Sequence, residues 1–290
     1  MKFFYYLSKL YWIGLIGLIG TFISSSPIFK ILCTFSLFVF VNILIDFAMI
    51  KCSILQIIGI IKLHFQFGDS VPTIDNFETM ISYSLPFKGK WMAVNGCIKK
   101  EYSHSWNIPT QRYAYDFVIL DDNNCSYCGE ETEVTSYYCY SKEILAPADG
   151  VVVEIKNNSK DSILLGKGKF IPRSKHIAGN YIVIRHAQNE YSTLAHLKKD
   201  SFVVNVGDKV SKGQVVALCG NTGNSTEPHL HFQLQNGQSF YASAGLPIKF
   251  HSILATPKEG YEKYDKRSHM QYGEILEGYV TRGFCYENNE

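Results

Sequence analysis

The chain has little net charge, and its first quarter has few charged side chains of either sign. The 290 residues carry 28 basic and 26 acidic side chains, a formal net charge of +2. Nucleic-acid partners are not expected, since binding a phosphate backbone relies on a strongly basic surface. From Phe3 to Phe67 the chain is rich in Phe, Ile and Leu, whereas after Gly68 it resembles an ordinary soluble protein. The sequence therefore predicts an apolar leader followed by a globular body.

The leader lacks a small-residue cleavage site and is too long for a cleaved secretory signal. Apolar runs cover Tyr11–Ile23, which extends back towards Phe3, and then Ile31–Ile50. Each is close to the roughly 20 residues that a membrane-spanning helix needs. A third run, Cys52–Phe67, is shorter and either spans or lies in the interface, because it carries Lys62 and His64. We expect residues 1–68 to be a membrane anchor of two or three α-helices in contact with lipid, and a buried hairpin is the alternative.

The body lacks any long segment at helical spacing and any internal repeat, which argues against α/β and repeat architectures. Short runs rich in β-branched residues, bounded by Gly and Pro, occur within 146–157, 179–197 and 206–220. Such strands at short, regular spacing predict an all-β body, a partly open sandwich or barrel resembling a barrel-sandwich.

A His-Glu-x-x-His motif is absent, but His229 and His231 form a His-x-His pair in "STEPHLHF". In a strand both imidazoles leave the same face, while Leu230 points into apolar packing. An isolated His-x-His pair on a polar sheet face usually binds no metal ion or other ligand. Two further residues change that expectation: Asp116 in the alternating strand "RYAYDFVIL" and His196 near the end of "YSTLAHL". A carboxylate among apolar neighbours needs a partner or a metal ion.

These segments, with "APADGVV" and "VGDKVSKGQVVALCGNTG", resemble zinc endopeptidases of the lysostaphin/LytM type, peptidase family M23. The resemblance covers roughly residues 90–250. It implies an M23-type peptidase domain, for which we expect the range 90–255, after a linker at 69–89 and before a C-terminal extension at 256–290. The extension is expected to add a pair of strands to the body, and it shows no recognisable chemistry.

The resemblance also implies roles for individual residues. Asp116 and His231 match ligands of a single zinc ion, and His196 and His229 match the two catalytic histidines. The family's first ligand commonly lies four residues before the Asp, where this chain has Arg112, a permanent cation that cannot bind zinc. We predict that His104 supplies the third ligand from a preceding loop. The alternative is that His104 is a surface residue and the metal site has been lost.

The turn before the His-x-His pair is predicted to contact substrate, because small residues allow a peptide backbone to come close to the metal. Its members are Gly223, Asn224, Ser225 and Thr226. The same segment is equally consistent with a tight turn of structural importance only. The other histidines of the body, His176, His186, His251 and His269, are expected to be solvated.

A cysteine-rich segment, "CSYCGEETEVTSYYC" from Cys125 to Cys139, interrupts the body and is here called the insert. One Cys-x-x-Cys pair is weak evidence for a metal, so a disulfide, free thiols and a metal knuckle all remain open.

Two functions follow from these features. The first is a membrane-tethered zinc endopeptidase that hydrolyses peptidoglycan peptides, with its catalytic domain outside the cytoplasm and no obligate protein partner. The second is an inactive relative that binds or regulates other cell-wall hydrolases. Asp116, His196, His229 and His231 together favour the first, whereas Arg112 favours the second.

Overall fold

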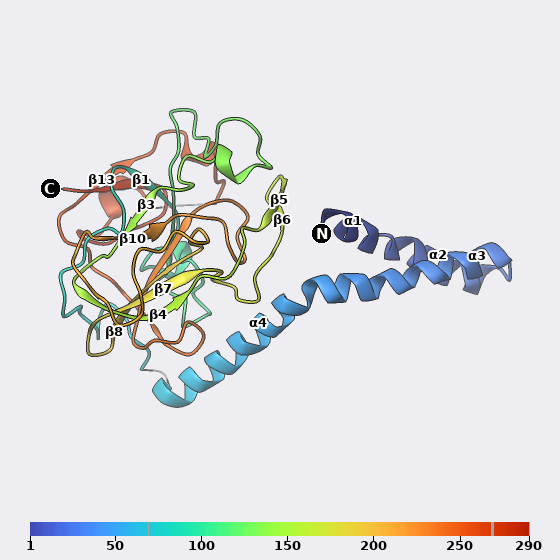
Figure 1. The fold of residues 1–290 in the computed structure, drawn as a ribbon, viewed down its shortest axis with the longest axis horizontal. Coiled ribbons are helices and arrows are strands. Elements are labelled where there is room, and N and C mark those ends of the chain that lie inside the picture. Colours follow the sequence, from blue (N-terminus) through green and yellow to red (C-terminus); the bar gives the residue numbers. More distant parts are fainter. Residues whose placement is uncertain (69, 268–269, 290) are drawn as a thin grey trace. The chain divides into compact units, whose positions relative to one another are not determined.

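The computed structural model describes residues 1–68, 70–267 and 270–289, without the side chains of residues 42, 44–46, 48 and 49. The chain divides into two compact units, Met1–Ile54 and Leu55–Glu290. The all-β body and the apolar helices that precede it in sequence are confirmed, since strands occupy the later part of the chain and long helices the earlier part (Figure 1).

The N-terminal helices are α1 (Lys2–Ser8), α2 (Tyr11–Ile23), α3 (Pro27–Cys33) and α4 (Phe38–Phe67), with a short 3-10 turn between α3 and α4. Helix α3 begins at a proline, and the preceding Ser26 side chain accepts a hydrogen bond from the backbone N–H of Ile28 at 3.4 Å. Helices α2 and α3 pack closely, because a Cβ added at Gly17 would lie 2.4 Å from the backbone nitrogen of Cys33. Small residues permit this close approach of two helices.

Two helical stretches, Lys2–Ile23 and Ile50–Phe67, are long and apolar enough to cross a membrane by length and composition alone. The run expected as the second span, Ile31–Ile50, is not a helix of its own. It is divided among α3, the 3-10 turn and the first half of α4. The third run continues α4 without a break, because no Gly or Pro pair separates it from the residues before it.

The body is built on one ten-stranded antiparallel sheet within the described residues, in the order β13-β14-β1-β2-β11-β8-β7-β4-β9, with β12 paired to β11. The strands of this sheet are β1 (Trp91–Asn95), β2 (Tyr115–Val118), β4 (Gly150–Lys156), β7 (Tyr181–Ala187), β8 (Glu190–Ala195), β9 (Lys209–Val210), β11 (Leu230–Gln235), β12 (Gly245–Leu246), β13 (Ile253–Pro257) and β14 (Phe284–Asn288). Two smaller pairs join β3 (Glu143–Leu145) to β10 (Val215–Leu218) and β5 (Ile163–Gly166) to β6 (Lys169–Ile171).

The main hydrophobic core lies on one face of this sheet, and strand β11 shows how the sequence selects that face. Leu230, Phe232 and Leu234 are fully buried in the core. The alternate residues, which include His231 and Gln233, leave the opposite face because side chains alternate along a strand. Full burial of a side chain such as Phe232 contributes about 1.5–3 kcal/mol, so the strand cannot slip by one residue at low cost.

The body begins earlier and ends later than the sequence indicated. Tyr83, Leu85 and Phe87, within the expected linker 69–89, are already buried in the core. At the other end, β14 lies between β1 and β13 in the sheet, so the last residues of the expected extension are part of it. Sequence separation hid this pairing, since β1 and β14 are almost 200 residues apart and no local pattern links them.

Candidate metal centre

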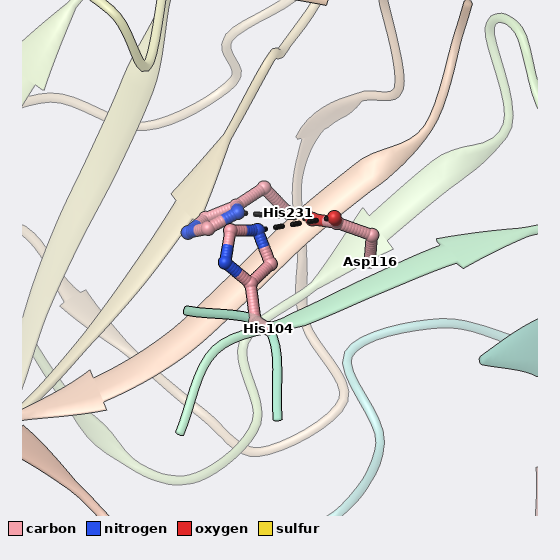
Figure 2. Close-up of side chains that lie close together, drawn as sticks. All are labelled: His104, Asp116 and His231. Atoms are coloured by element: carbon pink, nitrogen blue, oxygen red, sulfur yellow. Dashed lines mark hydrogen bonds and ion pairs between the residues drawn. The ribbon is translucent and has the colours of Figure 1, made fainter. Parts of the chain in front are cut away.

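Two neighbouring strands bring Asp116 and His231 together. Strands β2 and β11 pair in antiparallel register, with His231 directly opposite Asp116. Directly paired residues leave the same face of the sheet, so the carboxylate and the imidazole meet on the side away from the core. His104 reaches the same point from the loop that precedes β2, as Figure 2 shows.

The two imidazoles approach different oxygens of the one carboxylate. The His231 Nδ1–Asp116 Oδ1 distance is 3.0 Å, and the His104 Nε2–Asp116 Oδ2 distance is 3.1 Å (Figure 2). One potential ligand atom from each of the three residues lies within 4.8 Å of the others. Two imidazoles and one carboxylate are a donor set typical of a zinc site that keeps a position open.

The electrostatics of Asp116 favour its charged form. Burial would raise the pKa of this carboxyl, but the charges of His104 and His229 nearby, and the close polar contacts of its oxygens with the His104 and His231 rings, outweigh burial and hold the pKa well below its usual range. The side chain is only 14% exposed. Asp116 is therefore an ionised acceptor enclosed by imidazoles.

A line of glutamines sets the orientation of the His231 ring. The amide nitrogen of Gln235 donates to the backbone oxygen of Gly237 at 2.7 Å, so its Oε1 is the atom that accepts from Gln233 Nε2 at 2.6 Å. Gln233 Oε1 consequently faces His231 Nε2 at 3.0 Å and must accept an N–H from it. In neutral His231 the Nδ1 lone pair then faces the Asp116 carboxylate. Because both groups are acceptors, a cation or a proton between them would stabilise this arrangement.

This hydrogen bond to the ring nitrogen away from Asp116 is the outer support that metal-binding histidines commonly have. Gln233 and Gln235 are both fully buried. The sequence reasoning missed them, although a signal was present: in "HLHFQLQ" the glutamines continue the face of His231 at every second residue.

Arg112 lies outside the cluster and holds the loop that delivers His104. Its Nε donates to the backbone oxygen of Trp106 at 3.1 Å, and its guanidinium carbon lies 4.8 Å from the Trp106 ring centroid. Its own backbone oxygen accepts a hydrogen bond from Ser103 Oγ at 3.0 Å. Both contacts lie on either side of His104 in the sequence. The Arg112 side chain, which was expected to disfavour zinc binding, therefore fixes the conformation of the loop that carries His104.

His196 and His229 lie beside the cluster, with ring centroids 4.5 Å apart. His229 Nε2 is 3.6 Å from Asp116 Oδ1, and its Nδ1 is 2.8 Å from the backbone oxygen of Glu227. His196 Nδ1 is 2.6 Å from the backbone oxygen of Thr222. Because carbonyl oxygens only accept hydrogen bonds, both rings carry their proton on Nδ1 when neutral, and both have a free lone pair on Nε2.

His196 has two unusual features. Its backbone φ is 61°, a left-handed conformation that non-glycine residues adopt at some cost and that often occurs at functional sites. Burial first, and then His229 and His231, hold the pKa of the ring well below its usual range. His196 is therefore a neutral imidazole, enclosed at the edge of the cluster.

A cavity of about 210 Å³ opens onto the four histidines and Asp116. Of the turn residues predicted to contact substrate, Asn224 and Thr226 line this cavity and are exposed. Gly223 and Ser225 are buried instead. Gly223 has a φ of 88° and packs against the backbone of Gly179, so its place in the turn is explained by conformation.

The other histidines that the structure describes in the body do not belong to the cluster. His186 bonds to the backbone oxygen of Asp149 and to Ser192 Oγ, and burial lowers its pKa to about 4. Burial likewise lowers the pKa of His176 to about 3. The expectation that these two are solvated was wrong, because strand pairing and neighbouring rings cover them. His251 is exposed as expected, and His269 lies outside the described residues.

Support for the second oxygen of Asp116 comes from a distant part of the chain. Asn95 Nδ2 donates to Asp116 Oδ2 at 3.1 Å, and Asn95 Oδ1 accepts from an Arg267 guanidinium nitrogen at 3.2 Å. Arg267 in turn forms an ion pair with Asp265 at 2.6 Å. No local pattern in the sequence pointed to these residues, because β1 and the C-terminal segment meet Asp116 only in the folded body.

All eight cysteines are free, including the exposed Cys125 and Cys128. The insert therefore contains no disulfide in this structure. Its thiols stay separate from the histidine cluster, whose ligand atoms are nitrogen and oxygen.

Comparison with known proteins agrees with the resemblance seen in the sequence. The sequence model described as Peptidase family M23 matches residues 135–242. This range contains His196, His229 and His231, whereas His104 and Asp116 precede it. Among curated proteins, the peptidoglycan DD-endopeptidase ShyA of Vibrio cholerae serotype O1 is 44% identical over 70 residues, which are 24% of this chain and 16% of that protein. Lysostaphin of Staphylococcus simulans is 38% identical over 77 residues, 23% of this chain and 15% of lysostaphin.

The aligned part of the chain thus spans less than a fifth of the length of these relatives. Among solved structures, a zinc containing peptidase from Vibrio cholerae aligns at 20% identity with a TM-score of 0.35, covering 59% of this chain and 41% of that one. The catalytic domain of lysostaphin from Staphylococcus simulans aligns at 21% identity with a TM-score of 0.32, covering 55% of this chain and 88% of that domain.

Proposed function

We propose, from the premise that residues 135–242 are a domain of peptidase family M23, that the chain is a zinc-dependent endopeptidase acting on peptide bonds of bacterial peptidoglycan. His104, Asp116 and His231 would hold one zinc ion. The observation that carries the proposal is the facing pair of His231 Nδ1 and Asp116 Oδ1, with the far side of the ring already engaged by Gln233. A divalent cation satisfies both acceptors at once.

When bound, zinc supplies a Lewis acid that polarises a carbonyl and lowers the pKa of water towards about 7. The protein residues supply the rest of the chemistry. Neutral His229 offers the Nε2 lone pair beside Asp116 and is placed to accept a proton from water. His196, held by Thr222, presents Nε2 at the cavity and is placed to orient the water or to stabilise negative charge on the substrate oxygen.

Substrate would enter the cavity past Asn224 and Thr226, which form its exposed edge. A peptide of bacterial cell walls is the substrate class, because ShyA is a peptidoglycan DD-endopeptidase by name and is 44% identical to this chain over 70 residues. With one or two of the apolar helices in a membrane, the body would work at a membrane surface, and we place it on the extracytoplasmic side. No obligate protein partner or nucleic acid is required.

The competing function, an inactive relative that binds or regulates hydrolases, depended on Arg112. In the structure the Arg112 guanidinium is engaged by Trp106, and a second imidazole, His104, occupies the position near Asp116. Both observations support an intact metal site.

The test uses the full chain, purified in detergent, and two measurements. Zinc content is determined by elemental analysis, and release of soluble peptides from purified bacterial cell walls is followed over time. We expect about one zinc per chain and peptide release that a chelator stops. His104→Ala should lose tightly bound zinc and activity together, and His251→Ala is the control, because this histidine is exposed and outside the cluster. A chain that holds zinc but releases no peptide from any cell wall would favour the regulatory function, and one that takes up no zinc would refute the site.

A further inference from the structure

A second cavity, of about 580 Å³, adjoins the candidate metal centre. It shares Asp116, Thr226 and His229 with the cavity at the histidines, so the two form neighbouring parts of one depression. Its far walls come from the insert, through residues 125–127, Glu131 and Tyr137, and from the C-terminal segment around Tyr264. The function proposed above gives no task to either segment.

The carboxylate of Glu227 is a charged group of this cavity that belongs to the segment leading to His229. One oxygen accepts a hydrogen bond from Ser126 Oγ at 2.7 Å, and the other accepts from the Tyr264 hydroxyl. The Glu227 backbone oxygen is the partner of His229 Nδ1, which fixes this carboxylate close to the catalytic histidine. Among the described residues, no ion pair joins Glu227 to a basic side chain, so two neutral hydroxyls leave its negative charge uncompensated.

Aromatic rings surround the same space. Tyr127 and Tyr137 lie with ring centroids 5.1 Å apart, and both line the cavity together with Tyr264. Burial first, and then the charge of Glu227, raise the pKa of Tyr264, so that its hydroxyl stays protonated and neutral. The faces of aromatic rings attract cations, most strongly where water is partly excluded.

An unpartnered acceptor completes the cavity. Asn124 is 8% exposed and lines it. The amide nitrogen of Asn124 donates to the backbone oxygen of Glu259 at 3.0 Å, whereas its Oδ1 is buried and has no hydrogen-bond partner in the described part of the chain. A buried carbonyl oxygen without a donor is costly, so a donor group that reaches this oxygen would be bound favourably.

The basic residues of the lining do not fill this role. Arg267 is engaged by Asp265, with an Nε–Oδ2 distance of 2.8 Å. Lys263 is exposed, and none of the described ion pairs joins it to Glu227 or Glu131. The cavity therefore combines a carboxylate, aromatic faces and a free acceptor, all of which complement a positively charged donor.

We propose that this cavity is a specificity subsite for a primary ammonium group of the peptide substrate, held by Glu227 and enclosed by Tyr127, Tyr137 and Tyr264. The inference rests on the proposed function, because it assigns the ammonium group to the molecule cleaved at the neighbouring histidines. The group is either the α-amine of a peptide chain or the side-chain amine of a diamino acid residue. An ammonium group offers three N–H donors, which suits the carboxylate of Glu227 and the amide oxygen of Asn124 as acceptors.

The first experiment measures binding, independently of activity. The full chain in detergent is titrated with Nα-acetyl-lysine amide, with glycine amide and with the neutral Nα,Nε-diacetyl-lysine amide, and binding is followed by ligand-observed NMR. We expect one or both cationic probes to bind and the neutral probe to bind at least about tenfold more weakly. A side-chain amine is indicated if only the lysine probe binds, and an α-amine if only the glycine probe binds.

Substitutions then locate the site. Glu227→Gln keeps the shape but removes the charge and replaces one acceptor oxygen by a donor, and it should weaken binding of the cationic probe by about tenfold. Glu133→Gln, an exposed residue of the same insert that does not line the cavity, should have no effect. Tyr127→Leu should lower the affinity for the cationic probe by about three- to fivefold, because one aromatic face is lost. Equal binding of all probes, or cationic binding unchanged by both Glu227→Gln and Tyr127→Leu, would overturn the subsite.

The second experiment uses purified cell walls before and after chemical acetylation of their free amines. We expect the unmodified chain to cleave acetylated walls about tenfold more slowly than untreated walls. The Glu227→Gln variant should cleave acetylated and untreated walls at similar rates. Equal cleavage of both substrates by the unmodified chain would remove the subsite and leave the peptidase intact. If the chain cleaves neither wall preparation and binds no zinc, the proposed peptidase function is refuted. The NMR titration would still test whether the cavity binds an ammonium group.

Discussion

The ligands of the candidate metal centre come from two regions that are held in different ways. Asp116 and His231 belong to paired strands in the middle of a ten-stranded sheet, and their meeting follows from the register of that pair. His104 belongs to a loop, and its position depends on Ser103, Arg112 and Trp106. Only 4% of the His231 side chain is exposed, whereas 15% of the His104 side chain is exposed.

The difference indicates that the candidate metal centre combines a part held by strands with a part held by a loop. Strand register is set by many core contacts, so the Asp116–His231 pair exists wherever the sheet folds. The loop is held by a few local contacts, each of modest energy, and His104 can be lost without loss of the fold. Substitutions in the two regions should therefore differ in size and in kind.

The largest effect is expected from the strand pair. His231→Ala removes a ligand and the partner of Asp116, and we expect the chain to lose zinc and activity completely, as measured by zinc content after gel filtration. His104→Ala should lose tight binding but keep weak zinc association, because two ligands still converge. Equal zinc affinity in both variants would remove the distinction between the two regions.

A large effect on rate without an effect on zinc is expected from His196, which touches the cavity but not the proposed ion. His196→Ala should lower turnover of cell-wall peptides by about 10²- to 10⁴-fold while zinc content stays at about one per chain. Elemental analysis and peptide release on the same sample check both parts. Loss of stoichiometric zinc in this variant would show that His196 is a ligand, and the roles would need to be exchanged.

An intermediate effect is expected from the glutamine that supports His231. Gln233→Leu removes the acceptor for His231 Nε2–H, and zinc affinity should fall by about 10- to 100-fold in competition with a chromogenic chelator. Gln188→Leu, an exposed glutamine in the turn between β7 and β8, is the control. Unchanged affinity in folded Gln233→Leu protein would mean that the strand pair alone orients the imidazole.

The smallest effect is expected from Arg112, which acts only through the loop. Arg112→Ala should lower the zinc affinity by about tenfold, since one charge-assisted hydrogen bond and one ring contact are lost. Arg112→Lys should recover part of the affinity, because a lysine keeps the charge but not the planar contact with Trp106. In a His104→Ala background, Arg112→Ala should have no further effect, and an additive loss would place Arg112 in the site itself.

The same division explains how much could be predicted from the sequence. Alternation along strands pointed to Asp116 and to the His229–His231 pair as candidates, because local periodicity decides which side chains share a face. The resemblance, not the alternation, implied roles for these residues and for His196, and those roles stay predictions. Short runs of β-branched residues also predicted the all-β body. The third imidazole was a hypothesis that local pattern alone could not place, since loop position depends on contacts such as that of Arg112 with Trp106.

Contacts between distant segments were beyond sequence reasoning. The insertion of β14 between β1 and β13 and the hydrogen bond of Arg267 to Asn95 have no local signature. The same holds for the cavity formed by the insert and the C-terminal segment. Gln233 and Gln235 are a different case, because their alternation with the core residues of β11 was visible but was not connected to the histidine.

X-ray absorption spectroscopy at the zinc edge tests the central claim, that imidazoles from a strand and from a loop share one ion with Asp116. For the full chain loaded with one equivalent of zinc, we predict a shell of nitrogen and oxygen near about 2.0–2.1 Å, with outer scattering from two imidazole rings that falls to one ring in His104→Ala. A sulfur shell near about 2.3 Å, which would point to Cys125 and Cys128, would contradict the account, as would a two-ring signal that persists in His104→Ala.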